Sequence, residues 1–594
     1  MSDQVNLKIN DIDVTVEKGA TILDAAEKLN IKIPTLCHHE DLCIAGNCRV
    51  CVVEQQGQDR LSAACATPAG EGMEIYTNSG AVREARKTVI ALLLSEHNDD
   101  CLHCYKNGNC ELQDLATEYT VEADNYINIL GEDYTVDKSS PAIQKDDSKC
   151  IRCQRCVRTC EEIQGVSALC VANKGDEMKI TTAFDKPLAY VVCTNCGQCI
   201  NHCPTGALTE INYIDDVWKA IDDPEKHVVV QTAPAVRVGL GELLGYEPGE
   251  RVTGKMVTAL RRLGFDSVFD TNFTADLTIM EEGTELLTRL KKALVDGEDV
   301  ALPQFTSCSP GWIKYVEHTA PEILDTISSC KSPQQMLGPL AKTYYADKAG
   351  IDPEDMVVVS IMPCTAKKFE AGRPEMNDSG FQDVDYVLTT REFGHMIKQA
   401  GINFMKLEDS KCDSLLGEHS GAAVIFGATG GVMEAALRTA YEIVTGREVP
   451  FDNLNITPVR GMEGVRDAAI TIEDPLEEWS FLDGVELKVA VAHGLANAEK
   501  LVRQVEAGES PYHFIEVMAC PGGCLGGGGQ PIPISEEIRE KRTRAIYQED
   551  EDLPVRKSHE NPEIEHIYED FLGEPLSHKS HELLHTEYTA RDKN

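Results

Sequence analysis

The chain has 594 residues, of which 42% are apolar, and a formal net charge of −42. This length exceeds one ordinary hydrophobic core, so several domains are expected. The negative charge excludes a nucleic-acid-binding protein as the first interpretation, and the absence of a long apolar run or a signal peptide predicts a cytoplasmic protein without a membrane partner.

The 23 cysteines are concentrated near the N-terminus, where 17 of them lie before residue 204. They form tight Cys-x2-Cys groups in a large chain without a leader. This pattern indicates metal binding in a reducing compartment rather than disulfide bonds. The front third of the chain is therefore expected to be rich in metal centres.

Residues 1–79 are expected to form a first domain, with strands at 5–10 and 13–16 and an amphipathic helix at 20–29. The order of these elements and the cysteine spacing resemble a plant-type [2Fe-2S] ferredoxin domain, in the version found in respiratory complex I and in hydrogenase subunits. The resemblance implies a β-grasp fold. The implied ligands follow the spacing Cys-x10-Cys-x2-Cys-x13-Cys and are Cys37, Cys48, Cys51 and Cys65.

Residues 80–125 are expected to form a second module that begins with a helix at 81–95. Its candidate ligands are His97, Cys101, Cys104 and Cys110. By spacing alone, three thiolates and one imidazole also suit tetrahedral zinc. Because the pattern lies between two iron–sulfur modules, it resembles the [4Fe-4S] module held by one histidine and three cysteines, and we favour a cluster. Residues 126–140 are polar and predict a linker.

Residues 141–212 contain an internal repeat of Cys-x2-Cys-x2-Cys-x3-Cys, which is diagnostic of a bacterial ferredoxin with two [4Fe-4S] clusters. In that arrangement the fourth cysteine of each run binds the other cluster. The first set is therefore Cys150, Cys153, Cys156 and Cys203. The second set is Cys193, Cys196, Cys199 and Cys160.

Residues 225–575 predict an α/β domain, because apolar runs at 228–231, 356–362, 424–426 and 487–491 alternate with helical stretches. Its most unusual stretch is the glycine-rich loop at 516–531, which contains Cys520 and Cys524. Pro521 and the glycines beside it exclude a helix there. A bound metal centre is the natural reason for such a loop, since glycine lets the backbone approach a bulky group.

The motifs of this domain resemble the active-site motifs of [FeFe]-hydrogenase, and the resemblance covers essentially the whole chain. They lie at 232–237, 306–312, 362–370, 426–434 and 516–531, and a further matching stretch at 572–585 leads into a C-terminal tail at 576–594. The N-terminal modules resemble those of NAD(P)-linked and electron-bifurcating hydrogenases, with clostridial ferredoxin hydrogenase close behind. The family implies reversible oxidation of H2 to protons and electrons.

The resemblance also implies the active centre, an H-cluster. It consists of a [4Fe-4S] cubane joined through a cysteine sulfur to a diiron unit with CO, cyanide and an azadithiolate bridge. Cys364, Cys520 and Cys524 match cubane ligands, with Cys524 as the bridging one, and Lys367 matches the lysine that holds a cyanide. The residues that match the wall around the diiron unit are Met362, Met518, Pro234, Gln334 and Phe426.

A path for protons is expected along the helix predicted at 280–289. Helical spacing puts Glu282 and Glu285 on one face, with Arg289 one turn further on. By spacing alone this is an exposed, salt-bridged helix. The resemblance instead implies a proton relay to the surface through Cys308, Glu285, Ser328 and Glu282, with Arg289 close by.

The sequence departs from the family at Ser309, where a second cysteine is usual and serves as the fourth cubane ligand. A serine hydroxyl is a poor ligand for iron and must lose a proton of very high pKa to bind. Three outcomes stay open. Ser309 binds as an alkoxide, or Cys308 binds in its place and leaves the relay to Ser309, or the centre is altered or incomplete.

The alternative interpretations are a hydrogenase-like sensor or electron-transfer scaffold and a complex-I-like dehydrogenase subunit. The second accounts only for the first 212 residues. The chain has no flavin or nicotinamide fingerprint, so electrons that reach NAD(P) require other subunits. The expected partners are H2 and protons, ferredoxin, a flavin- and NAD(P)-binding subunit and a small [2Fe-2S] subunit.

Overall fold

The structure is a computed structural model that describes residues 4–122, 126–127, 129 and 134–592. The chain divides into two compact units. Unit 1 contains residues 1–162, 167–188 and 202–209. Unit 2 contains residues 163–166, 189–201 and 210–594.

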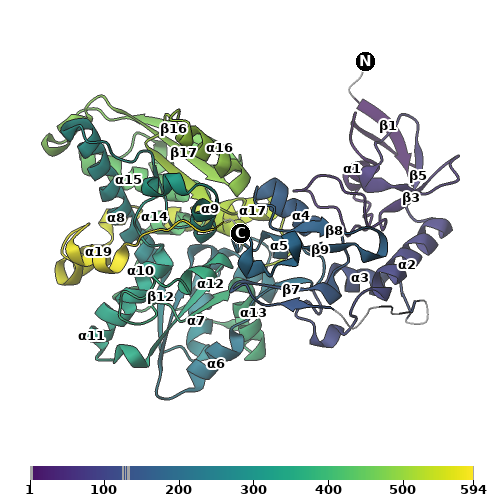
Figure 1. Ribbon diagram of the computed structural model, residues 1–594, viewed down its shortest axis with the longest axis horizontal. Helices are drawn as coiled ribbons and strands as arrows, with labels where there is room; N and C mark the ends of the chain where they lie inside the picture. Colours follow the sequence, from purple (N-terminus) through teal and green to yellow (C-terminus); the bar gives the residue numbers. More distant parts are fainter. Residues whose placement is uncertain (1–3, 123–125, 128, 130–133, 593–594) are drawn as a thin grey trace. The chain divides into compact units, whose positions relative to one another are not determined.

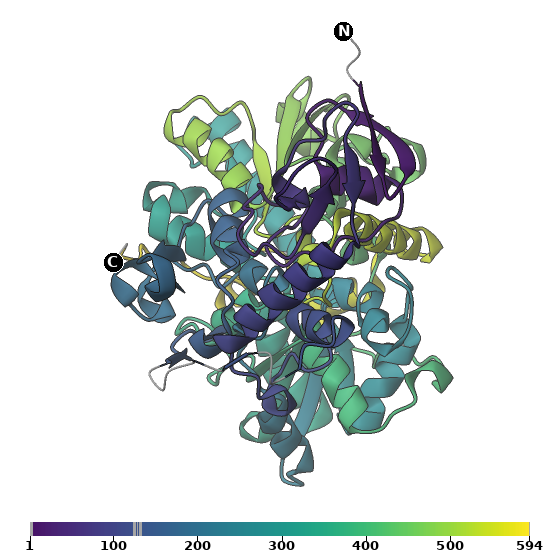
Figure 2. The same ribbon diagram turned by 90° about the vertical axis from the view of Figure 1, so that its right-hand side faces the viewer.

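Unit 1 begins with a five-stranded sheet in the order β2-β1-β5-β3-β4, which packs against helix α1 (Figures 1 and 2). The β1–β2 hairpin turns through Asn10 and Asp11, which both have positive φ as a type I′ turn requires. Thr21 and Asp24 form a capping box at the start of α1. The elements are β1 (Gln4–Ile9), β2 (Ile12–Glu17), α1 (Ile22–Lys28), β3 (Val52–Gln55), β4 (Ser62–Ala63) and β5 (Glu74–Tyr76).

The rest of unit 1 consists of short elements joined by loops that carry the cysteine motifs. They are α2 (Gly80–Ser95), α3 (Glu111–Glu118), β6 (Val136–Asp137), β7 (Ile143–Asp146), α4 (Arg155–Arg158), β8 (Cys170–Ala172), β9 (Lys179–Thr181) and β10 (Leu208–Glu210). Strand β6 pairs with β7, so the C-terminal end of the segment predicted as a linker is structured. Residues 128 and 130–133 of that segment lie outside the described residues.

Unit 2 is an α/β domain with two four-stranded sheets. The first, β12-β11-β14-β15, is fully parallel, and the second, β13-β18-β17-β16, has one antiparallel edge pair. Parallel strands are covered on both faces, which explains their continuous apolar runs. The strands are β11 (His227–Thr232), β12 (Ser267–Asp270), β13 (Gln304–Phe305), β14 (Met356–Met362), β15 (Tyr386–Thr389), β16 (Val465–Thr471), β17 (Glu486–His493) and β18 (Phe514–Met518).

The helices of unit 2 cover these sheets and carry the apolar core. They are α5 (Gln198–Asn201), α6 (Ile214–Asp222), α7 (Thr253–Leu263), α8 (Thr271–Lys291), α9 (Pro310–Thr319), α10 (Pro333–Leu340), α11 (Ala346–Ala349), α12 (Ala366–Ala371), α13 (Thr390–Gln399), α14 (Gly421–Ile425), α15 (Gly431–Thr445), α16 (Leu495–Glu506), α17 (Glu536–Asp552), α18 (Pro562–Ile567) and α19 (His578–Leu584).

The strand predicted at 424–426 is wrong, because these residues end the short helix α14 and the turn after it. Ser420 caps this helix by accepting a hydrogen bond from the backbone N–H of Ala423. The segment is buried on all sides, so its apolar run has no helical period that the sequence could show.

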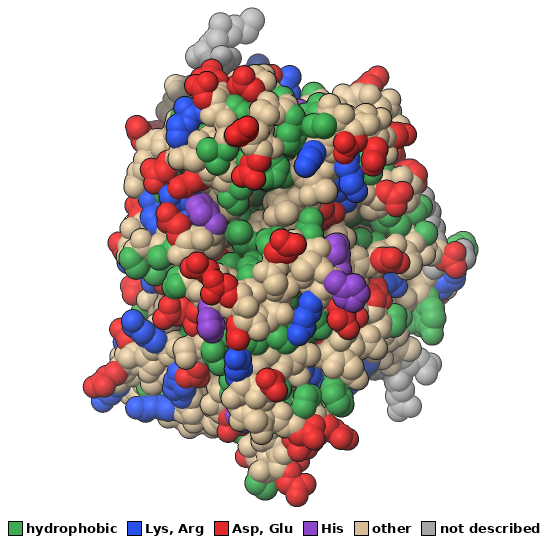
Figure 3. All heavy atoms as spheres, turned by 90° about the vertical axis from the view of Figure 1, so that its left-hand side faces the viewer, with side chains coloured by type: hydrophobic (Ala, Val, Ile, Leu, Met, Phe, Trp, Pro, Cys, Tyr) green, Lys and Arg blue, Asp and Glu red, His purple; other side chains and the backbone are tan. Residues whose placement is uncertain are grey.

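The acidic side chains do not gather in one patch on the face drawn in Figure 3. On the face drawn in Figure 3, acidic side chains are spread among lysines and arginines. None of the described helices combines the length and apolar character needed to span a bilayer.

Candidate active site

A cavity of about 80 Å³ opens in unit 2 where several parallel strands end. Met362 is the last residue of β14, Met518 is the last of β18, and Pro234 follows β11 closely. Carboxyl ends of parallel strands are where α/β folds bind ligands. The residues of the sequence motifs that line this cavity are Pro234, Cys308, Ser309, Gln334, Met362, Cys364, Lys367, Phe426, Met518, Cys520 and Cys524.

Three cysteine thiols face this cavity from two loops. Burial raises the pKa of Cys364, Cys520 and Cys524, in the last case to about 12, and neighbouring thiols add to the effect at Cys520 and Cys524. Buried thiolates are therefore stable only beside a cation. Soft sulfur donors in an apolar wall fit an iron–sulfur centre, so the residues present suit the cluster that the sequence predicts.

The glycine run after Cys524 is needed for backbone packing. A Cβ on Gly527 would overlap the carbonyl oxygen of Pro363, and one on Gly528 would overlap that of Cys196. The sequence predicts that these glycines make room for a bulky bound group. The observed contacts show that at least two of them also let three loops meet at the cavity.

The segment 189–201, which contains most of the second cysteine repeat, belongs to unit 2 and is hydrogen-bonded to the glycine run. Gln198 Nε2 donates to the carbonyl oxygen of Gly526 at 2.8 Å, and Asn201 Nδ2 donates to that of Gly527 at 3.1 Å. Cys196 lines the cavity wall. Of the three predicted cluster ligands in this segment, Cys196 therefore reaches the cavity.

Ser309 and Cys308 face different neighbours. Ser309 Oγ accepts a hydrogen bond of 3.2 Å from the backbone N–H of Ala519, next to Cys520. Burial raises the pKa of Cys308 well above its ordinary value, and the next largest contribution comes from Glu282. Ser309 is therefore tied to the loop of the cysteine ligands, whereas Cys308 is tied electrostatically to the predicted proton relay.

Lys367 lines the cavity, and a carboxylate and a backbone carbonyl hold its ammonium in place. Its Nζ lies 2.9 Å from Glu370 Oε2 and donates to the carbonyl oxygen of Cys308 at 3.2 Å. Glu370 also accepts hydrogen bonds from Ser332 at 2.9 Å and Gln334 at 3.1 Å. The sequence analysis did not single out Glu370, although its i+3 spacing from Lys367 on α12 was a usable signal.

Three of the predicted relay residues are joined by hydrogen bonds, whereas neither carboxyl oxygen of the buried Glu282 has a hydrogen-bond partner among the described residues. Ser328 Oγ donates to Glu285 Oε2 at 2.8 Å, and Arg289 Nη2 lies 2.7 Å from Glu285 Oε1. Burial, with a smaller contribution from the nearby Glu285 carboxylate, raises the pKa of Glu282 to about 8. Glu282 is 1% exposed, so it lies inside the protein rather than on a salt-bridged surface.

Glu516 is a second buried acid that the sequence analysis did not identify. It accepts hydrogen bonds from the backbone N–H groups of Gly430 at 2.6 Å and Met433 at 2.7 Å. Burial raises its pKa to about 7. A lone glutamate inside the apolar run of β18 was the available signal.

In unit 1, the predicted cluster ligands also gather. One cavity is lined by Cys150, Cys153, Cys156 and Cys203. In the first domain, Cys51 Sγ lies 3.3 Å from Cys65 Sγ, and the N–H of Cys48 donates to Cys37 Sγ at 3.5 Å.

The remaining sets are less closely defined. His97 is buried, and burial raises the pKa of Cys101 and Cys110, with a smaller contribution from Cys104 to both. Cys160 belongs to unit 1 and its three predicted partners belong to unit 2, so that set stays a prediction.

Family profiles match nearly the whole chain. The profile described as the iron only hydrogenase large subunit, C-terminal domain, matches residues 226–528, and that of the iron hydrogenase small subunit matches 536–591. The front of the chain matches a 2Fe-2S iron-sulfur cluster binding domain at 2–80 and an NADH-ubiquinone oxidoreductase-G iron-sulfur binding region at 86–124. It also matches the ferredoxin-like domain of NADH-quinone oxidoreductase subunit 3 at 140–209.

Whole-chain relatives agree with these profiles. The chain is 51% identical to the NADP-reducing hydrogenase subunit HndD of Solidesulfovibrio fructosivorans, over 99% of each chain. It is 42% identical to iron hydrogenase 1 of Clostridium pasteurianum, over 98% of this chain and 99% of that one. An apo [FeFe]-hydrogenase HydA1 structure from Chlamydomonas reinhardtii is 47% identical, with a TM-score of 0.58 over 64% of this chain and 100% of that one. The chain therefore belongs to the iron-only, or [FeFe], hydrogenase family, and it is an iron–sulfur enzyme that interconverts H2 with protons and electrons.

Proposed function

We propose that the cavity in unit 2 holds the complete H-cluster, a [4Fe-4S] cubane joined through Cys524 to a diiron unit with CO, cyanide and azadithiolate. Bound there, this group supplies the redox-active iron and the base at which H2 is split. The single observation that supports the proposal is the convergence of three thiols and the Lys367 ammonium on one cavity with largely apolar walls. Cys364, Cys520 and Cys524 would hold the cubane.

We assign the fourth cubane ligand to Ser309 rather than to Cys308. The support is the hydrogen bond between Ser309 Oγ and the N–H of Ala519, which directs this hydroxyl toward the loop of Cys520. A serine oxygen is a harder and more basic donor than a thiolate, so it would stabilise the oxidised cubane. Cys308 then stays a neutral thiol that is able to carry a proton.

Protons would leave the cavity through groups that are neutral or hydrogen-bonded at neutral pH. The Cys308 thiol exchanges a proton with Glu282, whose raised pKa keeps that carboxyl largely protonated at pH 7. We therefore propose Glu282 ahead of Glu285 in the relay, which reverses the order of the two glutamates that the resemblance implied. Ser328 Oγ donates a 2.8 Å hydrogen bond to Glu285 and would receive the proton from Glu282 and pass it on, and Arg289 holds Glu285 in place. A buried acid with a pKa near the working pH is suited to accepting and releasing protons.

The other wall residues would exclude water and orient the anionic ligands. Met362, Met518, Phe426 and Pro234 present apolar surface that does not compete for iron. Gln334 and Lys367 provide the N–H donors, and Glu370 keeps both side chains in position.

Electrons would pass through one [2Fe-2S] and three accessory [4Fe-4S] clusters, held by the ligand sets predicted above. We favour the cluster over zinc for His97 and its three cysteines. The corresponding domains are 1–79, 80–125 and 141–212, ahead of the catalytic domain at 225–575 and the tail at 576–594. The acceptors would be ferredoxin or cytoplasmic partner subunits that bind flavin and NAD(P) or carry a small [2Fe-2S] cluster.

Ser309 also favours a second function, that of a hydrogenase-like sensor or scaffold with slow turnover. The two are separated by loading the anaerobically purified chain with the diiron cofactor, recording the infrared bands of CO and cyanide, and measuring H2 uptake with a dye. We expect both bands and rapid uptake. Absence of both would reject the catalytic proposal, and bands with uptake that rises about tenfold or more in Ser309→Cys would support the sensor.

The matched control is Ser307→Cys, on the same loop. Ser307 Oγ donates to the carbonyl oxygen of Cys330 at 2.6 Å, and Ser307 does not line the cavity. A rise in uptake confined to Ser309→Cys would assign the effect to the cubane. A similar rise in both variants would indicate an unspecific effect of the added thiol.

A further inference from the structure

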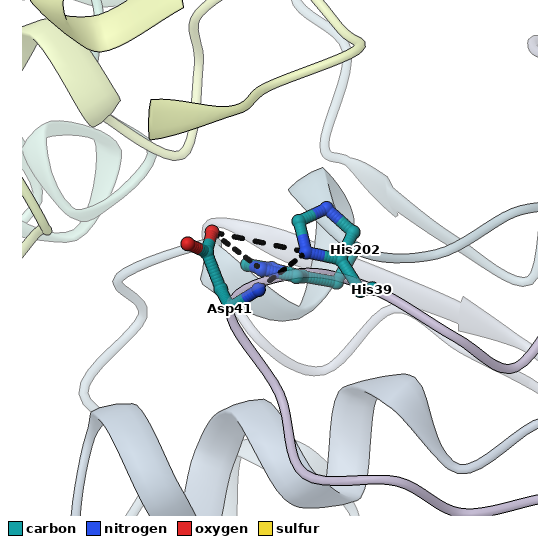
Figure 4. Close-up of side chains that lie close together, drawn as sticks. All are labelled: His39, Asp41 and His202. Carbon is teal, nitrogen blue, oxygen red and sulfur yellow. Dashed lines mark hydrogen bonds and ion pairs between the residues drawn. The ribbon is translucent and has the colours of Figure 1, made fainter. Parts of the chain in front are cut away.

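Two histidines and an aspartate that are far apart in the sequence meet within unit 1 (Figure 4). His39 and Asp41 lie in the loop that follows Cys37, and His202 lies directly before Cys203. Each offers one ligand atom, and the three atoms all lie within 4.8 Å of one another. None of these residues has a role in the proposed cluster sites.

The spacing of these atoms is that of ligands around a cation. His202 Nε2 lies 3.6 Å from Asp41 Oδ2, and His39 Nδ1 lies 3.8 Å from the same oxygen. Both separations exceed the 2.7–2.9 Å of a charge-assisted hydrogen bond. A tetrahedral zinc ion with bonds of about 2.0–2.1 Å separates its ligand atoms by about 3.3 Å, so small movements of the side chains would complete the site.

The arrangement of the rings supports the same interpretation. The two imidazoles have centroids 4.4 Å apart and planes inclined by 57°, so both present ring edges to Asp41 rather than stacking in parallel. His39 Nδ1 accepts a 3.3 Å hydrogen bond from the backbone N–H of Asp41, so this nitrogen faces the aspartate.

A second group of similar composition, in unit 2, includes a lysine ammonium. Glu442, His559 and Glu560 also lie close together, but Lys557 Nζ lies 2.7 Å from Glu442 and 2.9 Å from Glu560. That group already contains its cation. His202 is 1% exposed at its side chain, and Asp41 brings a formal negative charge to its ring nitrogen.

We propose that His39, Asp41 and His202 bind one divalent transition-metal ion, of which Zn²⁺ is the best match. The two imidazole nitrogens are borderline donors, which suit zinc better than calcium or magnesium, and zinc also accepts a carboxylate oxygen. The ion would join the loop after Cys37 to the loop before Cys203. It would therefore fix two predicted cluster-binding segments against each other.

The test is equilibrium dialysis of the anaerobic holoprotein against micromolar ZnCl2, with zinc and iron counted by mass spectrometry. We expect one zinc per chain without loss of iron. His39→Ala and Asp41→Ala are expected to weaken zinc binding by roughly tenfold or more. The matched control is His38→Ala, which removes the neighbouring imidazole and should bind zinc as the parent does.

X-ray absorption at the zinc edge identifies the ligands of the ion that binds. We expect nitrogen and oxygen at about 2.0 Å, with the outer-shell pattern of two imidazoles. A sulfur shell at about 2.3 Å would show that zinc had entered a cysteine site and would overturn the proposal. Equal loss of zinc in His38→Ala and His39→Ala, or no bound zinc at all, would also overturn it.

Discussion

The replacement Glu282→Gln tests whether a buried, protonated carboxyl carries the proton. The folded protein raises the pKa of Glu282 from 4.5 to about 8, mainly by burial. A raised carboxyl pKa means that the ionised form is destabilised in the folded state. Its contribution to stability therefore falls as the pH rises from 4.5 and becomes constant above about 8.

The size of this effect follows from the two pKa values, since one pKa unit corresponds to about 1.4 kcal/mol. The titration of Glu282 lowers the free energy of unfolding of the parent by about 2 kcal/mol at pH 6 and by about 5 kcal/mol at pH 9. Glutamine is similar in shape and does not titrate. The unfolding free energy of Glu282→Gln relative to the parent should therefore increase by about 3 kcal/mol between these two pH values.

The measurement is urea unfolding followed by tryptophan fluorescence. The three tryptophans are Trp218, Trp312 and Trp479, and all lie in unit 2. Dye-linked H2 uptake at pH 7 is measured on the same preparations, and we expect a loss of about 100-fold or more because glutamine cannot pass on a proton. A constant stability difference at pH 6 and pH 9 would refute the raised pKa, and full uptake would refute the relay.

The neighbouring Glu281→Gln serves as the control. Burial raises the pKa of Glu281, but hydrogen bonds from His585 and Tyr568 outweigh this and hold it below its ordinary value. Its ionised form is therefore stabilising at all pH values above 4.5. Glu281→Gln should therefore destabilise the protein at both pH 6 and pH 9, whereas Glu282→Gln should be more stable than the parent at both.

Three further replacements test the cavity. Ser309→Ala removes the proposed fourth ligand and leaves a buried N–H unpaired, so we expect lower cubane occupancy in the iron count and about 1–3 kcal/mol less stability; unchanged iron would contradict the assignment. Gly528→Ala places a Cβ against the carbonyl oxygen of Cys196, and a loss of stability of more than about 2 kcal/mol is expected in urea unfolding, whereas a neutral result would disprove this tight contact. Glu370→Gln leaves the Lys367 ammonium without its counter-charge, so the infrared cyanide bands should shift and stability should fall by about 3 kcal/mol or more; unchanged bands would exclude this role.

Much of the architecture could be predicted because its signals are local. The strands at 228–231, 356–362 and 487–491 were recognisable as continuous apolar runs, and these runs form β11, β14 and part of β17. The run at 424–426 gave the same signal but belongs to a buried helix end. A short apolar segment buried on all sides has no period that separates strand from helix.

Some site residues were also recognisable from local motifs, whereas others could be identified only from their surroundings in the fold. Cys364, Cys520, Cys524 and Lys367 stand in distinctive motifs, and the structure brings them to one cavity. The environment of Ser309 depends on a hydrogen bond to a loop far along the chain, which spacing cannot reveal. Buried acids such as Glu516 are recognisable only when their surroundings are known.

The hydrogen bonds between residues 189–201 and the glycine run limit where gene recombination can exchange the N-terminal domains of such enzymes. Gln198 and Asn201 supply amide donors to the carbonyl oxygens of Gly526 and Gly527, and Gly528 has no room for a side chain next to Cys196. A gene fusion that joined a foreign ferredoxin at residue 212 would replace residues 189–201 but keep the glycine run that they contact. Recombination that preserves the catalytic loop should therefore cross over upstream of residue 189, inside the ferredoxin fold.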